Sequence, residues 1–347
     1  MQYKNLGNTD IKVSQLCLGS MTWGTQNTYE DAQQQIEYSL NHGINFIDTA
    51  ELYPTTPLSA ETQGDTESII GKWVAESGRR NDVIIASKVA GNGPKWIDNG
   101  KDIDPDKIRK SVEGSLRRLQ TDYIDLYQLH WPNRGSYHFR QSWKFDPTSQ
   151  DRATFVRHVT DVLHTLKQFI DEGKIRHIGL SNESCWGAAQ FLTLAEQQNL
   201  PRMVTVQNEY SLMHRLFDLD FAELSHHENL GLLAFSPLAC GMLTGKYDTD
   251  AIPAGSRRSI AKNLTGRYTE KSLPALLRYN ELAKEHGLHP AQMALAFCMT
   301  RPFMTSVIFG ATSMQQLKVN VSAATTTLSA EIMDSIAGIH RDYPIPM

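Results

Sequence analysis

The sequence has only four cysteines and no closely spaced pair among them: they are Cys17, Cys185, Cys240 and Cys298. Without a CxxC pair, the chain offers neither the ligand spacing of a zinc site nor the framework of a disulfide-stabilised domain. Isolated, reduced thiols are typical of proteins kept in a reducing compartment. We therefore expect a cytoplasmic protein with no metal site.

Long apolar runs and dense runs of positive charge are missing as well. No stretch approaches the roughly 20 apolar residues that cross a membrane, and the N-terminal MQYKNLGNTDIKVS lacks the apolar core of a secretory signal. The chain has 34 basic and 38 acidic residues, for a net charge of -4, and no Lys/Arg cluster could follow a phosphate backbone. We expect neither a membrane nor a nucleic-acid partner, and no pattern indicates an oligomeric state.

A strand-GxGxxG-helix signature is also absent, which argues against a Rossmann-type nucleotide fold. Instead, short runs rich in Val, Ile and Leu alternate with amphipathic segments as eight strand-helix pairs. The short runs are almost continuously apolar, as expected for parallel strands covered on both faces. The 347 residues exceed the ~250 that a (β/α)8 barrel needs. The predicted fold class is therefore α/β: a (β/α)8 TIM barrel that forms a single domain over residues 1–347.

Two further elements are expected beside the eight pairs. The segments YKNL and IKVS flank the turn signal GNTD and predict an N-terminal β-hairpin that covers one end of the barrel. The segment LSAEIMDSIAGIHRD predicts an extra C-terminal helix, either outside the barrel or across its mouth. Within the eight pairs, the seventh helix is assigned to LPALLRYNELAKEHG.

Three connections that follow strands are too long to be simple turns: residues 54–65, 132–151 and 246–273. Because barrel active sites are built from such connections, we expect them to wall a substrate pocket. Aromatic side chains in or near these connections could line an apolar pocket or could pack the loops onto the barrel. They are Trp23, Tyr137, Phe139, Trp143 and Phe145.

Four polar residues lie at or just beyond the ends of the apolar runs: Asp48, Tyr53, Lys88 and His130. If the runs are neighbouring strands of one barrel, these side chains meet at a single mouth. A Lys88 ammonium would lower the pKa of the Tyr53 phenol, and Asp48 would keep that ammonium charged. His130 could donate a hydrogen bond to a substrate carbonyl. The set predicts a site that protonates an oxygen on which negative charge is growing.

None of these four residues is a nucleophile with an adjacent base, so the charge must come from a hydride or a carbanion. Polar groups at later strand ends could hold a nicotinamide carboxamide: Ser181 and Asn182 after the fifth strand, and Gln207 after the sixth. Alternatively, Ser181 and Asn182 could serve only as caps of the following helix. Phe235 offers a ring for stacking, and the glycines of SPLACGMLTGK permit close approach of a pyrophosphate.

The chain resembles the aldo-keto reductase family, and within that family it resembles the bacterial Tas-type members. The resemblance covers essentially the whole length and rests on LCLGSMTWG, INFIDTAELY, IIASKV, LQTDYIDLYQLHWP, GKIRHIGLSNES, VQNEYSL and AFSPLACGMLTGKY. It implies a (β/α)8 barrel that binds NADPH without a Rossmann fold and reduces an aldehyde or ketone. The expected ligands are therefore NADPH, with NADH left open, and a small-molecule carbonyl substrate.

The resemblance also implies a role for individual residues. Tyr53 is the general acid, Lys88 and Asp48 tune it, and His130 orients the carbonyl. The residues expected to hold the cofactor are Ser181, Asn182 and Gln207 at the carboxamide, Phe235 at the ring, Ser236, Pro237, Leu238, Gly241, Leu243, Gly245 and Lys246 along the pyrophosphate, and Gln316 and Asn320 near the adenosine.

The sequence departs from the family pattern in two places. Pro54 opens an insertion where many relatives follow the catalytic tyrosine with glycine. Gly310 and Gln316 stand where relatives often carry a lysine and an arginine for the 2′-phosphate of NADPH. A cation for that phosphate would have to come from elsewhere, and the candidates are Arg257, Arg258 and Lys318.

Two other functions compatible with the same residues stay open at this point. One is a cofactor-binding, redox-sensing regulatory subunit with little turnover. The other is an aldolase that forms a Schiff base on Lys88. The aldolase leaves Asp48 unexplained, because a nearby carboxylate raises the pKa of a lysine and suppresses the neutral amine.

Overall fold

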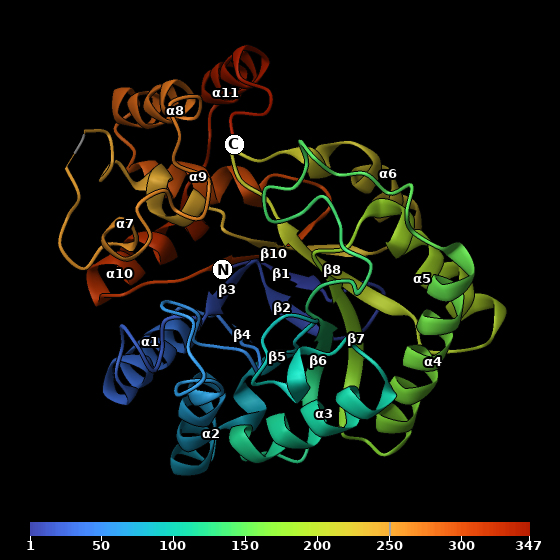
Figure 1. The fold of residues 1–347 in the computed structure, drawn as a ribbon. Coiled ribbons are helices and arrows are strands. Elements are labelled where there is room, and N and C mark those ends of the chain that lie inside the picture. The colour runs from blue at the N-terminus through green and yellow to red at the C-terminus, as the bar shows by residue number, and fades with distance from the viewer. Residues whose placement is uncertain (250) are drawn as a thin grey trace.

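The computed structural model describes residues 1–249 and 251–347, and its centre is a closed barrel of eight parallel strands (Figure 1). The strands follow one another around the barrel in chain order, and the last pairs with the first to close it. The predicted (β/α)8 barrel is confirmed. Its strands are β3 (Leu16–Gly19), β4 (Phe46–Asp48), β5 (Ile84–Val89), β6 (Ile124–Leu129), β7 (Ile175–Ser181), β8 (Met203–Glu209), β9 (Gly231–Phe235) and β10 (Met304–Phe309).

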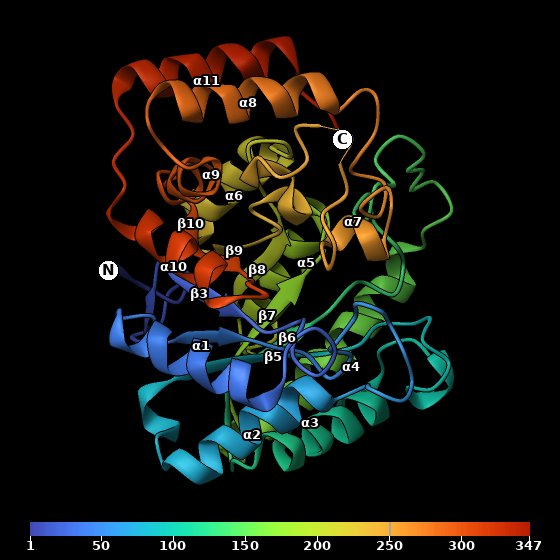
Figure 2. The same cartoon turned by 90° about the vertical axis from the view of Figure 1, so that its left-hand side faces the viewer.

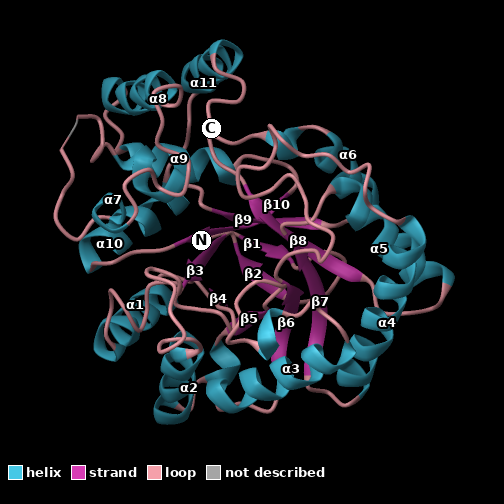
Figure 3. Cartoon of the chain, viewed as in Figure 1, coloured by secondary structure: helices cyan, strands magenta, loops and turns pink. Residues whose placement is uncertain are grey.

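A ring of helices surrounds the strands (Figure 3). None of the helices in the described parts of the chain combines the length and the apolar character needed to cross a bilayer. The helices are α1 (Tyr29–Asn41), α2 (Asp65–Ser77), α3 (Pro105–Leu119), α4 (Arg152–Asp171), α5 (Cys185–Gln197), α6 (Asp220–Glu228), α7 (Arg257–Ile260), α8 (Leu273–Glu285), α9 (Pro290–Met299), α10 (Met314–Ser322) and α11 (Ala330–Asp342).

The seventh helix that packs on the barrel is α9. The prediction that LPALLRYNELAKEHG forms this helix is wrong. That segment forms α8, which lies outside α9 and runs beside α11 (Figure 2). Helix α9 packs against β10 on one side and α8 on the other, so its sequence PAQMALAFCM is apolar on nearly every face. A helix buried all round has no amphipathic period to detect. The extra C-terminal helix is present as α11, outside the barrel.

The N-terminal hairpin closes one end of the barrel. Its strands β1 (Tyr3–Asn5) and β2 (Lys12–Ser14) are antiparallel, as predicted. Leu6 and Val13 of this hairpin are fully buried. They pack against one apolar side chain from each of seven barrel strands, which are Cys17, Phe46, Ala86, Leu126, Val204, Leu233 and Ile308.

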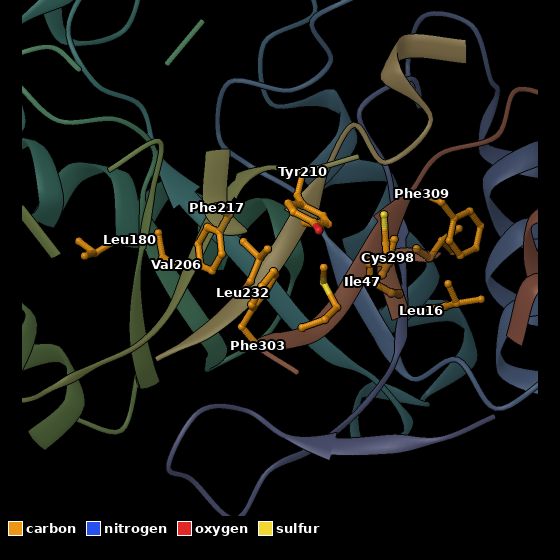
Figure 4. Packing of buried hydrophobic residues seen from close by; sticks show 14 of the residues in the cluster. Leu16, Ile47, Leu180, Val206, Tyr210, Phe217, Leu232, Cys298, Phe303 and Phe309 are labelled. Carbon is orange, nitrogen blue, oxygen red and sulfur yellow. The ribbon is translucent and has the colours of Figure 1, made fainter. Parts of the chain in front are cut away.

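A larger core fills the space between the strands and the helices. Figure 4 shows part of it, with Leu16, Ile47 and Phe309 on barrel strands and Tyr210, Phe217 and Phe303 on the connections. This core holds the eight strands in fixed register, so the interior of the barrel is free to carry polar side chains at the end away from the hairpin.

Candidate active site

Alternation along the strands places polar side chains above the apolar interior layer. In a β-strand, residues two apart point to the same face. The interior residue of the apolar layer is therefore followed, two positions on, by a buried polar residue nearer the mouth. The pairs are Phe46 and Asp48 in β4, Ala86 and Lys88 in β5, and Leu126 and Gln128 in β6.

Lys88 is the centre of this polar layer. Its side chain is completely buried, and its ammonium donates to Asp48 Oδ2 at 2.8 Å and to the Thr49 carbonyl at 2.8 Å. It also lies 3.3 Å from the Tyr53 hydroxyl. The other oxygen of Asp48 accepts a hydrogen bond of 2.7 Å from Gln207. The carboxylate is thus fully engaged, as a buried charge requires.

The ionisation of these groups follows from their burial and mutual charges. Burial works against the ammonium of Lys88, but the charge of Asp48 and the hydrogen bonds to Asp48 and Tyr53 outweigh it and raise the pKa of Lys88 above its ordinary value. Burial also raises the pKa of Tyr53, and the opposing effect of Lys88 is smaller. The Lys88 ammonium thus opposes the rise in the pKa of Tyr53, as the sequence predicted, but desolvation is the larger effect, so the phenol keeps its proton at neutral pH.

His130 lies on the other side of Tyr53, with the two rings in an edge arrangement and their centroids 5.8 Å apart. Burial, together with the charge of Lys88, lowers the pKa of His130 well below its ordinary value. The imidazole is consequently neutral at pH 7 and can donate one hydrogen bond. Its Nδ1 atom has no partner among the described residues.

A cavity of about 800 Å³ opens above this layer. All three long connections contribute to its wall, for example through Thr55, Phe139 and Arg257, as the sequence predicted. Of the residues proposed for catalysis, Asp48, Tyr53 and His130 line the cavity, whereas Lys88 lies behind them.

Of the five aromatic residues that could line the pocket or pack the loops onto the barrel, one lines the cavity. Phe139 lines the cavity. Trp23 is fully buried and donates to Gln35, and Tyr137 packs on Phe145. Trp143 is 71% exposed and does not line the cavity.

Ser181, Asn182 and Gln207 lie together at one side of the cavity. Ser181 donates to the Gln207 carbonyl at 2.9 Å, and Asn182 donates to the His130 carbonyl at 2.9 Å. The oxygen of the Asn182 amide is buried without a partner among the described residues. An unpaired amide acceptor fits the amino group of a nicotinamide carboxamide, so these residues suit the expected cofactor. Asn182 does not cap α5, because Ser184 does.

The segment after β9 follows the same cavity wall. Phe235, Ser236, Pro237, Leu238, Gly241 and Lys246 line the cavity. A Cβ atom at Gly241 would lie 2.9 Å from Lys246 Nζ, so glycine leaves the room that this ammonium occupies. Lys246 has no acidic partner among the described residues, which fits a phosphate ligand. Leu243 is buried in the outer core, and Gly245 lies outside the lining.

Gln316 and Asn320 line the far end of the cavity, on α10. The amide oxygen of Gln316 accepts hydrogen bonds from the backbone and hydroxyl of Thr312. Of the three candidate replacement cations, Arg257 lines the cavity, and its charge lowers the pKa of Tyr53, so it acts near the catalytic end. Arg258 stacks on Tyr268 and Lys318 is exposed; neither lines the cavity.

Sequence reasoning missed several polar residues around the cavity. Gln128 lies within the apolar run of β6 and accepts a hydrogen bond from Gln207 at 3.3 Å. Glu209 ends β8, and its carboxylate binds Arg140 and Arg267. The sequence did contain a signal for Glu209, because this charged residue ends the run MVTVQNE. Nothing in the loop sequence marked its two arginine partners. The described residues contain no group of three or more side chains suited to a metal ion.

Comparisons with known proteins agree with this geometry. The model described as "Aldo/keto reductase family" matches residues 15–341. "Protein tas" of Escherichia coli (strain K12) is 44% identical, over 100% of this chain and 99% of that protein. "Uncharacterized oxidoreductase YrpG" of Bacillus subtilis (strain 168) is 33% identical, over 96% of this chain and 94% of that protein. An Arabidopsis thaliana protein named "Probable voltage-gated potassium channel subunit beta" is 30% identical, over 99% of this chain and 98% of that protein.

Proposed function

Because the chain belongs to the aldo/keto reductase family, we propose that it is an NAD(P)H-dependent oxidoreductase that reduces an aldehyde or ketone to an alcohol. The observation that carries this proposal is the contact between Tyr53 and the buried Lys88–Asp48 pair at the floor of a large cavity, with His130 beside them. Tyr53, Lys88, Asp48 and His130 are the proposed catalytic residues.

A bound reduced nicotinamide would supply a hydride to the carbonyl carbon. Tyr53 then gives the proton of its hydroxyl to the carbonyl oxygen, on which negative charge grows. The phenolate left behind lies next to the Lys88 ammonium, which stabilises it until solvent returns the proton. The neutral His130 donates to the same carbonyl oxygen and orients it.

NADPH is the proposed cofactor, and NADH is the alternative. Ser181, Asn182 and Gln207 would hold the carboxamide, and Phe235 would stack on the ring. The proposed pyrophosphate and adenosine contacts are Ser236, Pro237, Leu238, Gly241, Lys246, Gln316 and Asn320, all of which line the cavity; Leu243 and Gly245, which do not line it, are left out of the proposal. The Asn182 amide oxygen has no hydrogen-bond partner and the Lys246 ammonium has no acidic partner among the described residues, and both facts support this placement.

The test is Tyr53→Phe, assayed with NADPH and a panel of aldehydes and ketones. Loss of the general acid should lower kcat by roughly 10² to 10⁴. Cofactor affinity should stay nearly constant, because the hydroxyl is not among the proposed cofactor contacts. Tyr38→Phe, on α1, is the matched control and should leave kcat unchanged. Equal turnover in wild type and Tyr53→Phe would exclude the assignment.

A second candidate function is a redox-sensing regulatory subunit. It is favoured by the Arabidopsis thaliana and Oryza sativa relatives, both of which are named "Probable voltage-gated potassium channel subunit beta". Sustained steady-state turnover on several carbonyls would argue for the enzyme. One slow turnover followed by tightly retained oxidised cofactor would argue for the subunit.

The Schiff-base aldolase is disfavoured by the surroundings of Lys88. A nucleophilic lysine must be a neutral amine. Here three oxygen partners surround the nitrogen, and the pKa of Lys88 is raised. Borohydride reduction in the presence of a carbonyl substrate should therefore give no covalent adduct on Lys88.

A further inference from the structure

Two long connections meet at Glu209, at the end of β8. Glu209 Oε2 lies 2.6 Å from Arg140 Nη2, in the connection after β6. Glu209 Oε1 lies 2.7 Å from Arg267 Nε, in the connection after β9. The side chains of Glu209, Arg140 and Arg267 are 2%, 15% and 6% exposed. This largely desolvated cluster, which we call the Glu209 cluster, borders the cavity through both arginines.

The Glu209 cluster has one carboxylate for two guanidinium groups and so carries one excess positive charge. Neighbouring groups do not remove that excess. Burial lowers the pKa of His138 to about 4 and also lowers the pKa of His214, so both are neutral at pH 7. The buried carboxylates of Asp48 and Glu183 already pair with Lys88 and Arg134. A buried, uncompensated cation beside a cavity favours an anionic ligand.

Arg140 is the member of this cluster with unused hydrogen-bonding capacity. Its Nε and Nη1 atoms have no acceptor among the described residues. The other arginine, Arg267, also donates to the Leu264 carbonyl and the Thr265 hydroxyl. A Cβ atom at Gly266 would lie 3.1 Å from Arg140 Cγ, so this glycine makes room for the arginine stem. Gly266 has a φ of 87°, which also favours glycine.

Arg140 lies on the same cavity wall as the catalytic imidazole. His130 and Trp131 have ring centroids 4.9 Å apart, and Trp131 and Phe139 have centroids 6.3 Å apart. Phe139 directly precedes Arg140, and all of these residues line the cavity. A substrate whose carbonyl oxygen contacts His130 can therefore extend along the aromatic pair toward the guanidinium.

We propose that Arg140 determines substrate specificity by binding a carboxylate group carried by the carbonyl substrate. The substrate class is then an oxo acid, in which an aldehyde or ketone and a carboxylate are separated by a short apolar segment, and the product is a hydroxy acid. This inference rests on the proposed carbonyl reductase function. Glu209 and Arg267 act as positioning residues that hold the guanidinium at the wall.

The experiment compares two acids with their neutral esters. The substrates are 4-formylbenzoate and 4-oxobutanoate, each beside its methyl ester, with NADPH as cofactor. Wild type should prefer each acid, and Arg140→Gln should reduce the acid-to-ester ratio of kcat/KM by about 10- to 100-fold, the range for a charge-assisted hydrogen bond. Turnover of the esters should stay within about threefold. Arg140→Lys, which keeps the charge and is the milder change, should reduce the ratio by less.

Three controls identify the source of any effect. Arg152→Gln removes the same charge from an exposed position at the start of α4 and should leave the ratio unchanged. Arg257→Gln removes a third cavity-lining arginine, one outside the Glu209 cluster; loss of acid preference there and not in Arg140→Gln would overturn the proposal. A lower NADPH affinity in Arg140→Gln at a constant acid-to-ester ratio would assign Arg140 to the cofactor and would also overturn it.

Failure of this proposal is distinguishable from failure of the proposed function. If wild type reduces both esters but shows no acid preference, only the role of Arg140 is rejected. If wild type reduces neither acids nor esters although NADPH binds, the reductase function itself is rejected. If Arg140→Gln does not fold, the acid-to-ester ratio of Arg140→Lys decides, because an unchanged ratio in that variant contradicts the proposal.

Discussion

Glu51 is a buried carboxylate that holds the chain two residues before Tyr53. It is 4% exposed and accepts hydrogen bonds from the Ala90 amide and the Ser111 hydroxyl, each at 2.5 Å. Its backbone amide donates to the Lys88 carbonyl at 3.2 Å. Glu51 thus ties the Tyr53 loop to the end of β5 and to the middle of α3. Among the described residues no arginine or lysine forms an ion pair with this carboxylate, so none offsets its burial directly.

We expect the contribution of Glu51 to the stability of the protein to fall with rising pH. Burial raises the pKa of Glu51 to about 7, although the hydrogen bonds from Ser111 and Ala90 oppose this. The folded protein therefore keeps a proton that the unfolded chain releases near pH 4.5, and stability is lost as pH rises from there to about 7. The loss should be about 3 kcal/mol, at 1.36 kcal/mol for each pKa unit.

The measurement is urea unfolding of wild type and Glu51→Gln from pH 5 to pH 8. The difference between the two proteins at each pH isolates Glu51, because the buried histidines contribute equally to both. Relative to wild type, the variant should gain stability as pH rises. Glu285→Gln, an exposed change at the end of α8, should give a constant difference. A constant difference for Glu51→Gln as well would contradict the prediction.

The place of a single side chain was predictable where the residue follows a clear strand. Its pKa and its interaction partners were less predictable, because they depend on the surrounding structure. The apolar runs before Asp48, Lys88 and His130 were enough to bring these side chains together. The direction of the Tyr53 pKa shift was not predictable, because it depends on how completely the phenol is desolvated. Arg140 was not predictable either, because its partner Glu209 is 69 positions away, at the end of strand β8.

At the scale of elements, the N-terminal hairpin has a structural task separate from the chemistry. Leu6 and Val13 fill the end of the barrel interior opposite to the polar layer around Lys88. Hydrogen bonds also attach the hairpin, including those from Lys4 Nζ to the Met304 carbonyl at 2.7 Å and from Asn45 Nδ2 to the Lys12 carbonyl at 2.9 Å. Apolar packing of Leu6 and Val13 against the interior layer adds to these bonds.

Leu6→Ala should destabilise the protein without changing the chemistry. Truncating a fully buried leucine typically costs about 2–5 kcal/mol, because the cavity left behind collapses only partly. Urea unfolding should report this loss, whereas kcat/KM of the folded protein should stay within about twofold, because the apolar layer separates Leu6 from Tyr53. Lys12→Ala, exposed on β2, should change stability by less than about 0.5 kcal/mol. A large loss of kcat/KM under conditions where the Leu6→Ala protein is fully folded would show that the two ends of the barrel are coupled.

Elements were predictable where one face meets water. Helix α11 has an apolar stripe and a capping residue, Ser329, and the segment LSAEIMDSIAGIHRD located it closely from the sequence. Helix α9 was missed because it lies between β10 and α8 and is apolar throughout. The three long connections were located by length alone, whereas their internal contacts depend on distant parts of the chain.

At the scale of the whole molecule, charge is distributed unevenly along the cavity. The cationic side chains in its wall are Arg140, Lys246, Arg257 and Arg267 among the described residues. The end on α10 presents neutral groups, including Gln315, Gln316 and Asn320. If the adenosine of the cofactor lies at this end, a 2′-phosphate meets amides and solvent there rather than an ion pair. NADPH and NADH should then bind with similar affinity.

Gln316→Arg should convert this neutral end into one that prefers NADPH. A charge-assisted hydrogen bond from the guanidinium to the 2′-phosphate should raise NADPH affinity by about 10-fold or more. NADH lacks that phosphate, so its affinity should stay within about twofold. Titration of cofactor fluorescence with each dinucleotide measures both affinities. Gln197→Arg adds the same charge at the exposed end of α5, away from the cavity, and should change neither. An equal gain for NADPH and NADH in Gln316→Arg would mean that the new charge acts on the pyrophosphate, and the adenosine would then have to lie elsewhere in the cavity.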